Sequence, residues 1–157
     1  MRVAFLASGG LSHHPANIFP QDLADAPDRV KEYLMYGGVR GAMTVNGWHK
    51  YLGEQTVLGG QSVIEGRRTA TDFRINREWD ERFLTAFTKG DYTVFDSWDS
   101  TEIVRDAGVA AMEIQQWIAA ASAAHIAGVK PVVVDAHVTT VEYRLSVAVA
   151  HADPLPR

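Results

Sequence analysis

Short apolar runs separated by glycine and proline breaks divide the first half of the sequence into predicted elements. The apolar run at residues 2–8 ends at Gly9-Gly10, which predicts a buried strand followed by a tight turn. Asp25-Ala-Pro27 is typical of a helix start, and Gly37-Gly38 is typical of a helix end. Residues 39–75 contain glycines throughout and predict an irregular insertion or loop region.

The second half of the chain has clearer periodicity. Asn76 is a predicted N-cap for a helix with aromatic residues at every fourth position, and Asp99 is predicted to cap a shorter helix. The aromatic positions are Trp79, Phe83 and Phe87. Residues 109–126 predict a long alanine-rich helix, and residues 130–137 and 141–151 predict two strands. Together these elements predict an α/β fold with a central sheet flanked by helices.

Composition narrows the classes of protein to consider. A length of 157 residues with 46% hydrophobic residues is enough for a single domain with a sizeable core, spanning residues 1–157. A net charge of −4 argues against a nucleic-acid partner. The absence of cysteine excludes disulfides and thiolate metal sites and fits a cytoplasmic protein. We expect no signal peptide and no membrane span, because no apolar run is long enough.

His13 and Glu113 are the two residues whose surroundings suggest chemistry. His13 follows a predicted strand end and a glycine pair, where an imidazole can exchange protons near neutral pH or can simply bind a loop carbonyl. Glu113 lies at the edge of the apolar stripe of its predicted helix, beside Trp117. A carboxylate there is either solvated at the rim or bound to a cation. The residues alone leave both alternatives open.

Three segments carry a resemblance to a known family. Residues 8–13, Ser-Gly-Gly-Leu-Ser-His, resemble the Ser/Thr-Gly-Gly-Leu/Met-Ser-His segment of the class III extradiol ring-cleavage dioxygenases, relatives of the protocatechuate 4,5-dioxygenase catalytic subunit. Residues 107–124 resemble the family's Gly-x-x-x-x-Glu-x-x-x-Trp helix, and residues 75–91 resemble its Asn-x-Glu-x-Asp-x-x-Phe-Leu helix with a Gly-Asp exit. The interval between the first and last motifs is long, as it is in the 2,3-dihydroxyphenylpropionate dioxygenase branch. The chain therefore resembles the C-terminal half of enzymes of that branch.

The resemblance implies a reaction and assigns roles to the matched residues. These enzymes use non-haem Fe²⁺ and O2 to cleave a catechol-like ring. The resemblance implies that His13 is the catalytic acid/base and that Glu113 is the carboxylate ligand of the iron. A carboxylate with two imidazoles forms the facial triad that leaves positions on Fe(II) open for substrate.

Two features depart from the family pattern. Both metal-binding histidines of the family lie in an N-terminal half that precedes the segment on which this sequence opens. The resemblance therefore implies a hetero-oligomer, in which a partner subunit supplies the two histidines and the small aromatic substrate binds between the chains. The region 139–151 also lacks the family's usual Pro-Glu-Trp-like segment, which predicts an altered end of the substrate pocket.

Two other classes of function remain open. The chain could be a non-catalytic partner subunit, or the scaffold could support a metal-independent acid/base reaction by His13 and Glu113. His14 has no role assigned by its spacing. His125 continues the apolar helix stripe and is predicted to be buried and hydrogen-bonded rather than to bind metal.

Overall fold

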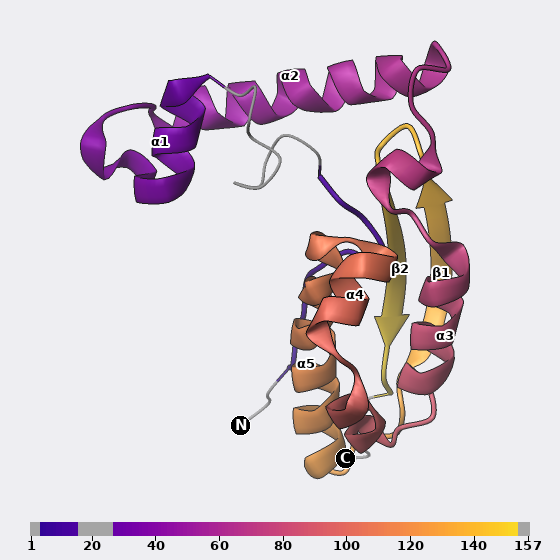
Figure 1. The fold of residues 1–157 in the computed structure, drawn as a ribbon. Helices are drawn as coiled ribbons and strands as arrows, with labels where there is room; N and C mark the ends of the chain where they lie inside the picture. Colours follow the sequence, from indigo (N-terminus) through magenta and orange to yellow (C-terminus); the bar gives the residue numbers. More distant parts are fainter. Residues whose placement is uncertain (1–3, 16–26, 154–157) are drawn as a thin grey trace.

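The computed structural model describes residues 4–15 and 27–153. Figure 1 shows a main body of helices packed on a small sheet, from which one pair of helices projects as an arm. The elements in chain order are α1 (Asp28–Tyr36), the 3₁₀ turn η2 (Gly37–Arg40), α2 (Val45–Ile64), η3 (Ala70–Phe73), α3 (Arg77–Phe87), η4 (Tyr92–Ser97), α4 (Ser100–Ala107), η5 (Val109–Glu113), α5 (Ile114–Ile126), β1 (Val133–Thr140) and β2 (Leu145–His151). The chain is thus a mixed helix and sheet protein, as predicted.

The predicted helix caps are confirmed. Asn76 accepts a hydrogen bond from the backbone of Trp79 at the start of α3, and Asp99 accepts from Thr101 and Glu102 at the start of α4. These side chains satisfy backbone N–H groups that have no partner inside the helix. At the C-terminal end of α1, Gly37 has a φ of 61°, a backbone conformation that favours glycine.

The sheet of the described residues has two strands. β1 and β2 pair antiparallel, with Val138 opposite Val147 and His137 opposite Ala148. One face of this hairpin packs on the helices, because Ala148 and Ala150 contact the core. The other face exposes apolar side chains, namely Val133, Val138, Val147 and Val149.

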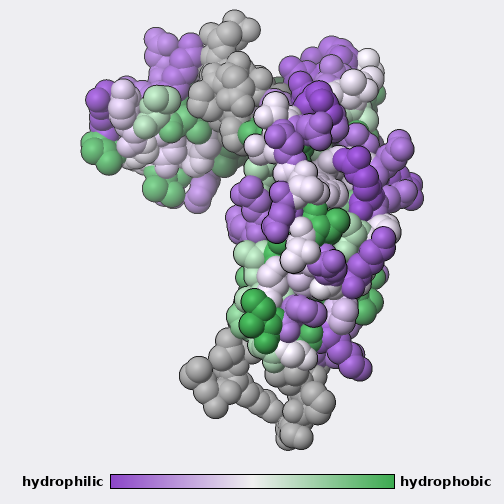
Figure 2. All heavy atoms as spheres, turned by 60° about the horizontal axis from the view of Figure 1, so that its bottom comes forward, coloured by the Kyte–Doolittle hydropathy of each residue, from purple (hydrophilic) through white to green (hydrophobic). Residues whose placement is uncertain are grey.

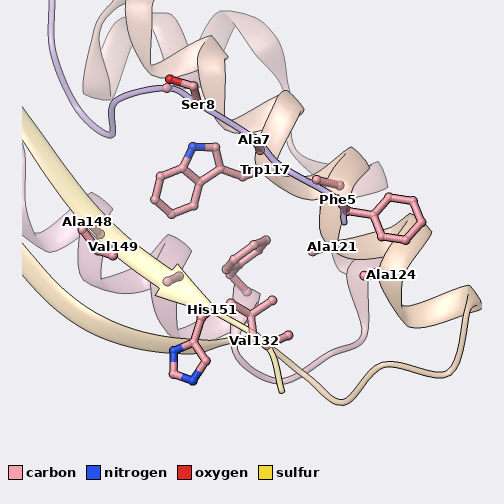
Figure 3. A pocket seen from close by; sticks show the side chains of 15 residues that line it. Phe5, Ala7, Ser8, Trp117, Ala121, Ala124, Val132, Ala148, Val149 and His151 are labelled. Carbon is pink, nitrogen blue, oxygen red and sulfur yellow. The ribbon is translucent and has the colours of Figure 1, made fainter. Parts of the chain in front are cut away.

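The strand expected at residues 2–8 is not present in its described part. Residues 4–10 have no regular secondary structure and no strand partner among the described residues. The segment reaches the sheet only further along, where Leu11 N donates to Ser146 O at 2.8 Å and Ser146 N donates to Ser12 O at 3.1 Å. A cavity of about 380 Å³, lined by residues from both sides, separates the segment from β2 (Figure 3). Without an adjacent backbone the apolar run cannot form a ladder.

The structure also corrects the prediction for residues 39–75. Most of this region is not a loop but the twenty-residue helix α2, which begins after the N-cap Thr44. Glycines disfavour the interior of a helix, yet two of the glycines in α2 permit close packing. A Cβ at Gly59 would lie 2.6 Å from Arg144 Nε, and a Cβ at Gly60 would lie 3.1 Å from the carbonyl oxygen of Glu142. Tertiary contact therefore outweighs the low helix propensity of glycine here.

The core is an aromatic cluster built on α3. Trp79, Phe83 and Phe87 stack along the helix at centroid distances of 6.0 and 5.4 Å. Trp117 of α5 packs against Phe83 and Phe87, at 6.4 and 5.9 Å. The predicted spacing of four residues is confirmed, since it places all three rings on the buried face.

The projecting arm consists of α1 and α2. Tyr33 of α1 stacks on Trp48 of α2 at a centroid distance of 5.1 Å, which holds the two helices together. Apolar side chains remain exposed on the arm, among them Val39, Val57 and Ile64. Figure 2 shows hydrophobic residues on the surface of this arm and again on the main body. No helix of the described residues is long and apolar enough to cross a membrane.

Candidate functional site

The first and last predicted motifs meet at Gly10. Gly10 N donates to Glu113 Oε2 at 2.6 Å, although the two residues are 103 positions apart in the sequence. His13 lies on the same glycine, because a Cβ at Gly10 would be 2.6 Å from His13 Cε1. The structure thus brings His13 and Glu113 together around one backbone position.

Glycines make this close approach possible. A Cβ at Gly9 would lie 2.7 Å from Glu113 Cβ, which is closer than real contacts allow. Gly108 has a φ of 89°, and a Cβ there would lie 2.3 Å from the carbonyl oxygen of His13. Three glycines from two distant segments therefore allow the loop of His13 to lie directly against the start of the helix that presents Glu113.

The tautomer of His13 follows from its hydrogen bond. Its Nδ1 lies 2.9 Å from the carbonyl oxygen of Leu11, and a carbonyl can only accept. In the neutral ring Nδ1 therefore carries the proton, and Nε2 has the lone pair. The ring is half-buried, so Nε2 is the nitrogen available to take a proton from another group.

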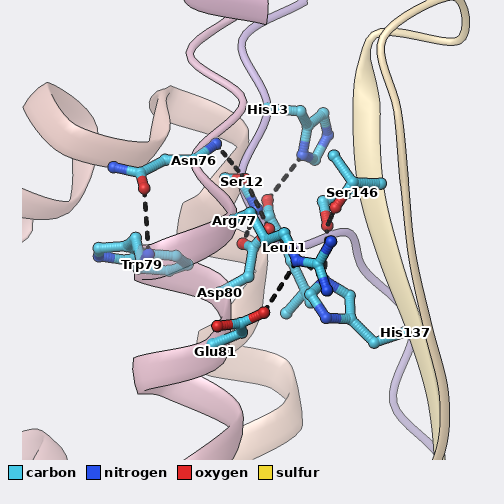
Figure 4. A network of polar contacts seen from close by, with 11 residues as sticks. Leu11, Ser12, His13, Asn76, Arg77, Trp79, Asp80, Glu81, His137 and Ser146 are labelled. Carbon is cyan, nitrogen blue, oxygen red and sulfur yellow. Dashed lines mark hydrogen bonds and ion pairs between the residues drawn. The ribbon is translucent and has the colours of Figure 1, made fainter.

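A buried carboxylate fixes the loop immediately before His13 (Figure 4). Asp80 is 0% exposed and accepts hydrogen bonds from Ser12 N at 2.7 Å and Ser12 Oγ at 2.8 Å. Asn76 N in turn donates to Ser12 Oγ at 2.9 Å. A buried carboxylate with several donors is well satisfied, and breaking one of these bonds would leave a costly unpaired charge.

The same network extends to the sheet. His137 Nε2 is 2.9 Å from Ser146 Oγ and 3.6 Å from Asp80 Oδ2. Sequence reasoning gave Asp80 and His137 no role. A signal for Asp80 was available, since this acid lies on the buried face of its helix between Trp79 and Phe83. The pairing with Ser12 was not readable, because it joins positions 68 residues apart.

The remaining histidines do not join the site. His125 was predicted to be buried, but it is exposed, with its ring edge-on to Tyr92 at 5.9 Å. The prediction was wrong because α5 turns that position outward from the apolar stripe. His14 is half-buried, and its backbone N donates to the carbonyl oxygen of Phe73 at 2.8 Å.

The cavity beside β2 adjoins these groups only through Gly9, which lines it and packs against Glu113. It is lined mainly by small apolar residues and by Trp117, and neither His13 nor Glu113 contributes to it (Figure 3). Within residues 4–15 and 27–153 there is also no cluster of three potential metal ligands from His, Asp, Glu or Cys. The described residues thus offer a candidate base and one candidate carboxylate ligand, but not a complete metal site.

Comparison with known proteins decides the family. Residues 1–146 match the family model described as the catalytic LigB subunit of aromatic ring-opening dioxygenase. The chain belongs to the LigB family. This LigB-family chain is 38% identical over 128 residues to a 2,3-dihydroxyphenylpropionate/2,3-dihydroxicinnamic acid 1,2-dioxygenase of Rhodococcus jostii (strain RHA1), covering 81% of this chain and 38% of the relative.

A second relative extends the match along nearly the whole sequence. A protein with the same name from Cupriavidus necator is 31% identical over 153 residues, which covers 98% of this LigB-family chain and 46% of the relative. The chain therefore spans less than half the length of these curated relatives. No solved structure was found to match it.

Proposed function

We propose that this chain is a subunit of an extradiol-type dioxygenase that cleaves a catechol-like ring with O2. Residues 1–157 act as one domain, with His13 as the catalytic acid/base and Glu113 as a ligand of Fe²⁺. The observation that carries the proposal is the meeting of His13 and Glu113 at Gly10, in a chain of the LigB family.

The geometry of His13 suits proton transfer. Because Nδ1 donates to the carbonyl of Leu11, Nε2 can accept a proton from a catechol hydroxyl and later return it. The Ser12–Asp80 hydrogen bonds hold the backbone beside it, so the ring keeps one orientation through both transfers.

Glu113 fits one position of an iron site. Its Oε2 is oriented by Gly10 N, and a hard carboxylate oxygen is the single acidic donor of a facial triad. We propose that two histidines of a partner subunit complete the site, since the described residues contain no triad. Bound Fe²⁺ would supply the coordination of the diol and of O2.

The substrate class comes from the relatives. Their names specify a catechol with a propionate or acrylate side chain, and we propose that this chain also acts on a catechol that carries an acidic side chain. A cytoplasmic location, an interface without nucleic acid, and a shared site between two chains belong to the same proposal.

The test is co-purification from the native host, followed by iron analysis and O2 uptake on catechols. We expect a partner chain to copurify, iron to be retained by the complex, and O2 to be consumed with a yellow ring-cleavage product. A complex that binds no iron and consumes no O2 would contradict the proposal. Activity in the isolated, metal-free chain would instead favour an acid/base reaction without iron.

A further inference from the structure

Arg144 is a buried cation with no acidic partner among the described residues. Its side chain is part of a residue only 6% exposed, and its Nε has no hydrogen-bond partner. Its Nη2 donates a long hydrogen bond to Thr56 Oγ1, at 3.4 Å. Among residues 4–15 and 27–153, no carboxylate forms an ion pair with it.

The backbone around Arg144 is built to hold the guanidinium in this place. Arg144 has a φ of 60°, which is uncommon for a residue with a side chain. Helix α2 has Gly59 where it crosses the guanidinium, and a Cβ there would lie 2.6 Å from Nε. A strained backbone conformation and a glycine contact that both serve one side chain indicate a functional position.

A second arginine lies close by. Arg144 Cζ is 5.7 Å from the ring centroid of Phe73, and Arg68 Cζ is 5.8 Å from the same ring. Burial, and secondly the charge of Arg68, lower the pKa of Arg144. Hydrogen bonds from Thr69 to the Asp72 carboxylate lower the pKa of Asp72, and the charge of Arg68 lowers it further. Two positive charges thus lie at similar distances from the same buried ring, and a second positive charge near an unpaired guanidinium favours binding of an anion.

This pair of arginines adjoins the loop of the candidate catalytic base. The carbonyl oxygen of Phe73 accepts from His14 N, next to His13. Arg144 also lies two positions before Ser146, whose backbone bonds to Leu11 and Ser12. The segment that carries Arg144 is therefore joined by backbone hydrogen bonds to the loop of His13, at the start of β2.

We propose that Arg144, assisted by Arg68, binds the side-chain carboxylate of an aromatic acid whose ring lies beside His13. The inference rests on the proposed function, and it assigns the residues that select an acidic substrate. A planar guanidinium can bind a carboxylate through two parallel hydrogen bonds, and Nε is one of the donors that this geometry uses.

The experiment measures binding of 3-phenylpropionate and of its neutral amide by titration calorimetry, first to the isolated chain. Neither ligand has the diol, so iron and turnover are not needed. We expect the acid to bind at least about 10-fold more tightly than the amide. Arg144→Met should weaken binding of the acid by about 10- to 100-fold, the range for hydrogen bonds to a charged group. It should leave binding of the amide unchanged.

Two further variants keep the test valid if Arg144→Met does not fold. Gly59→Ala should displace the guanidinium and reduce the preference for the acid, while Arg68→Gln should reduce it by a smaller factor. Arg67→Gln is the matched control, because that neighbouring arginine already pairs with Glu65. The Arg67→Gln protein should bind both ligands as the wild type does.

The outcomes separate this inference from the proposed function. Equal binding of acid and amide, or an unchanged preference in Gly59→Ala and Arg68→Gln, would overturn the role of Arg144 even if the complex cleaves catechols. A preference for the acid that disappears when the partner chain binds would also overturn it, since a partner carboxylate would then occupy the site. An acid preference lost in the variants supports the inference whether or not ring cleavage is found.

Discussion

Glu113 is the residue that we propose as the iron ligand of this chain. Replacing it by Gln preserves an oxygen that can accept from Gly10 N but removes the charge, whereas Ala removes both. We expect both variants to lose iron from the complex, and only Glu113→Ala to disturb the loop as well. Metal analysis of the complex and the amide NMR shift of Gly10 measure the two effects.

The control for Glu113 is Glu78→Gln, an exposed acid of α3 that should leave the iron content unchanged. Full iron occupancy in Glu113→Ala would show that this carboxylate is not a ligand.

His13 and His14 should differ although they are adjacent. His13→Gln retains a donor for the carbonyl of Leu11 but cannot exchange protons, so we expect iron to remain bound and turnover to fall about 10²- to 10⁴-fold. His14→Gln should lower turnover much less, because the sequence motif gives His14 no role in proton transfer. Single-turnover rates and iron content check this. Loss of iron in His13→Gln would make His13 a ligand instead of a base.

At the scale of elements, Gly108 is decisive for the join between α4 and η5. A side chain there meets the carbonyl oxygen of His13 and also strains the backbone, since its φ is 89°. We expect Gly108→Ala to lower the free energy of unfolding by about 1–3 kcal/mol or more. Urea denaturation measures it.

The matched control is Gly53→Ala in α2, an exposed helix position with open space around its Cβ. It should raise stability by roughly 0.5–1 kcal/mol, because alanine favours a helix. A stabilising Gly108→Ala would contradict the close approach seen at His13.

Elements were predictable where their signals are local. The caps at Asn76 and Asp99 and the ring spacing of α3 depend on residues within one or two turns, and all were found. Helix α2 was not predicted, because its Gly59 is explained by a contact with Arg144, which lies far away in the sequence. The segment before Gly9 reads as a strand, but pairing requires a neighbouring backbone that a local pattern does not reveal. The family motifs singled out His13 and Glu113 as candidates. The hydrogen bonds from Ser12 to Asp80 could be found only in the folded arrangement.

At the scale of the whole molecule, the described residues expose apolar surface, from which we expect a partner. The outer face of the hairpin exposes Val138, Val147 and Val149 side by side, and large apolar patches of this kind mark interfaces. We expect light scattering after size-exclusion chromatography to show a dimer or a hetero-oligomer. Val149→Lys should weaken the association by at least about 10-fold, because it buries a charge without a partner.

Val94→Lys is the control for this experiment, since Val94 is exposed on η4 and not on the sheet. A soluble, iron-binding, active monomer would contradict the expectation of a partner.

The loop at residues 10–14 has a consequence for observing this molecule in solution. Its amides bond to four different places, namely the Gly10 amide to Glu113, that of Leu11 to β2, that of Ser12 to α3, and that of His14 to Phe73. Each amide hydrogen exchanges with solvent only when its own contact opens. Deuterium uptake along five consecutive residues would therefore report separately on the opening of four elements, and slower exchange at Gly10 alone would register a change at Glu113.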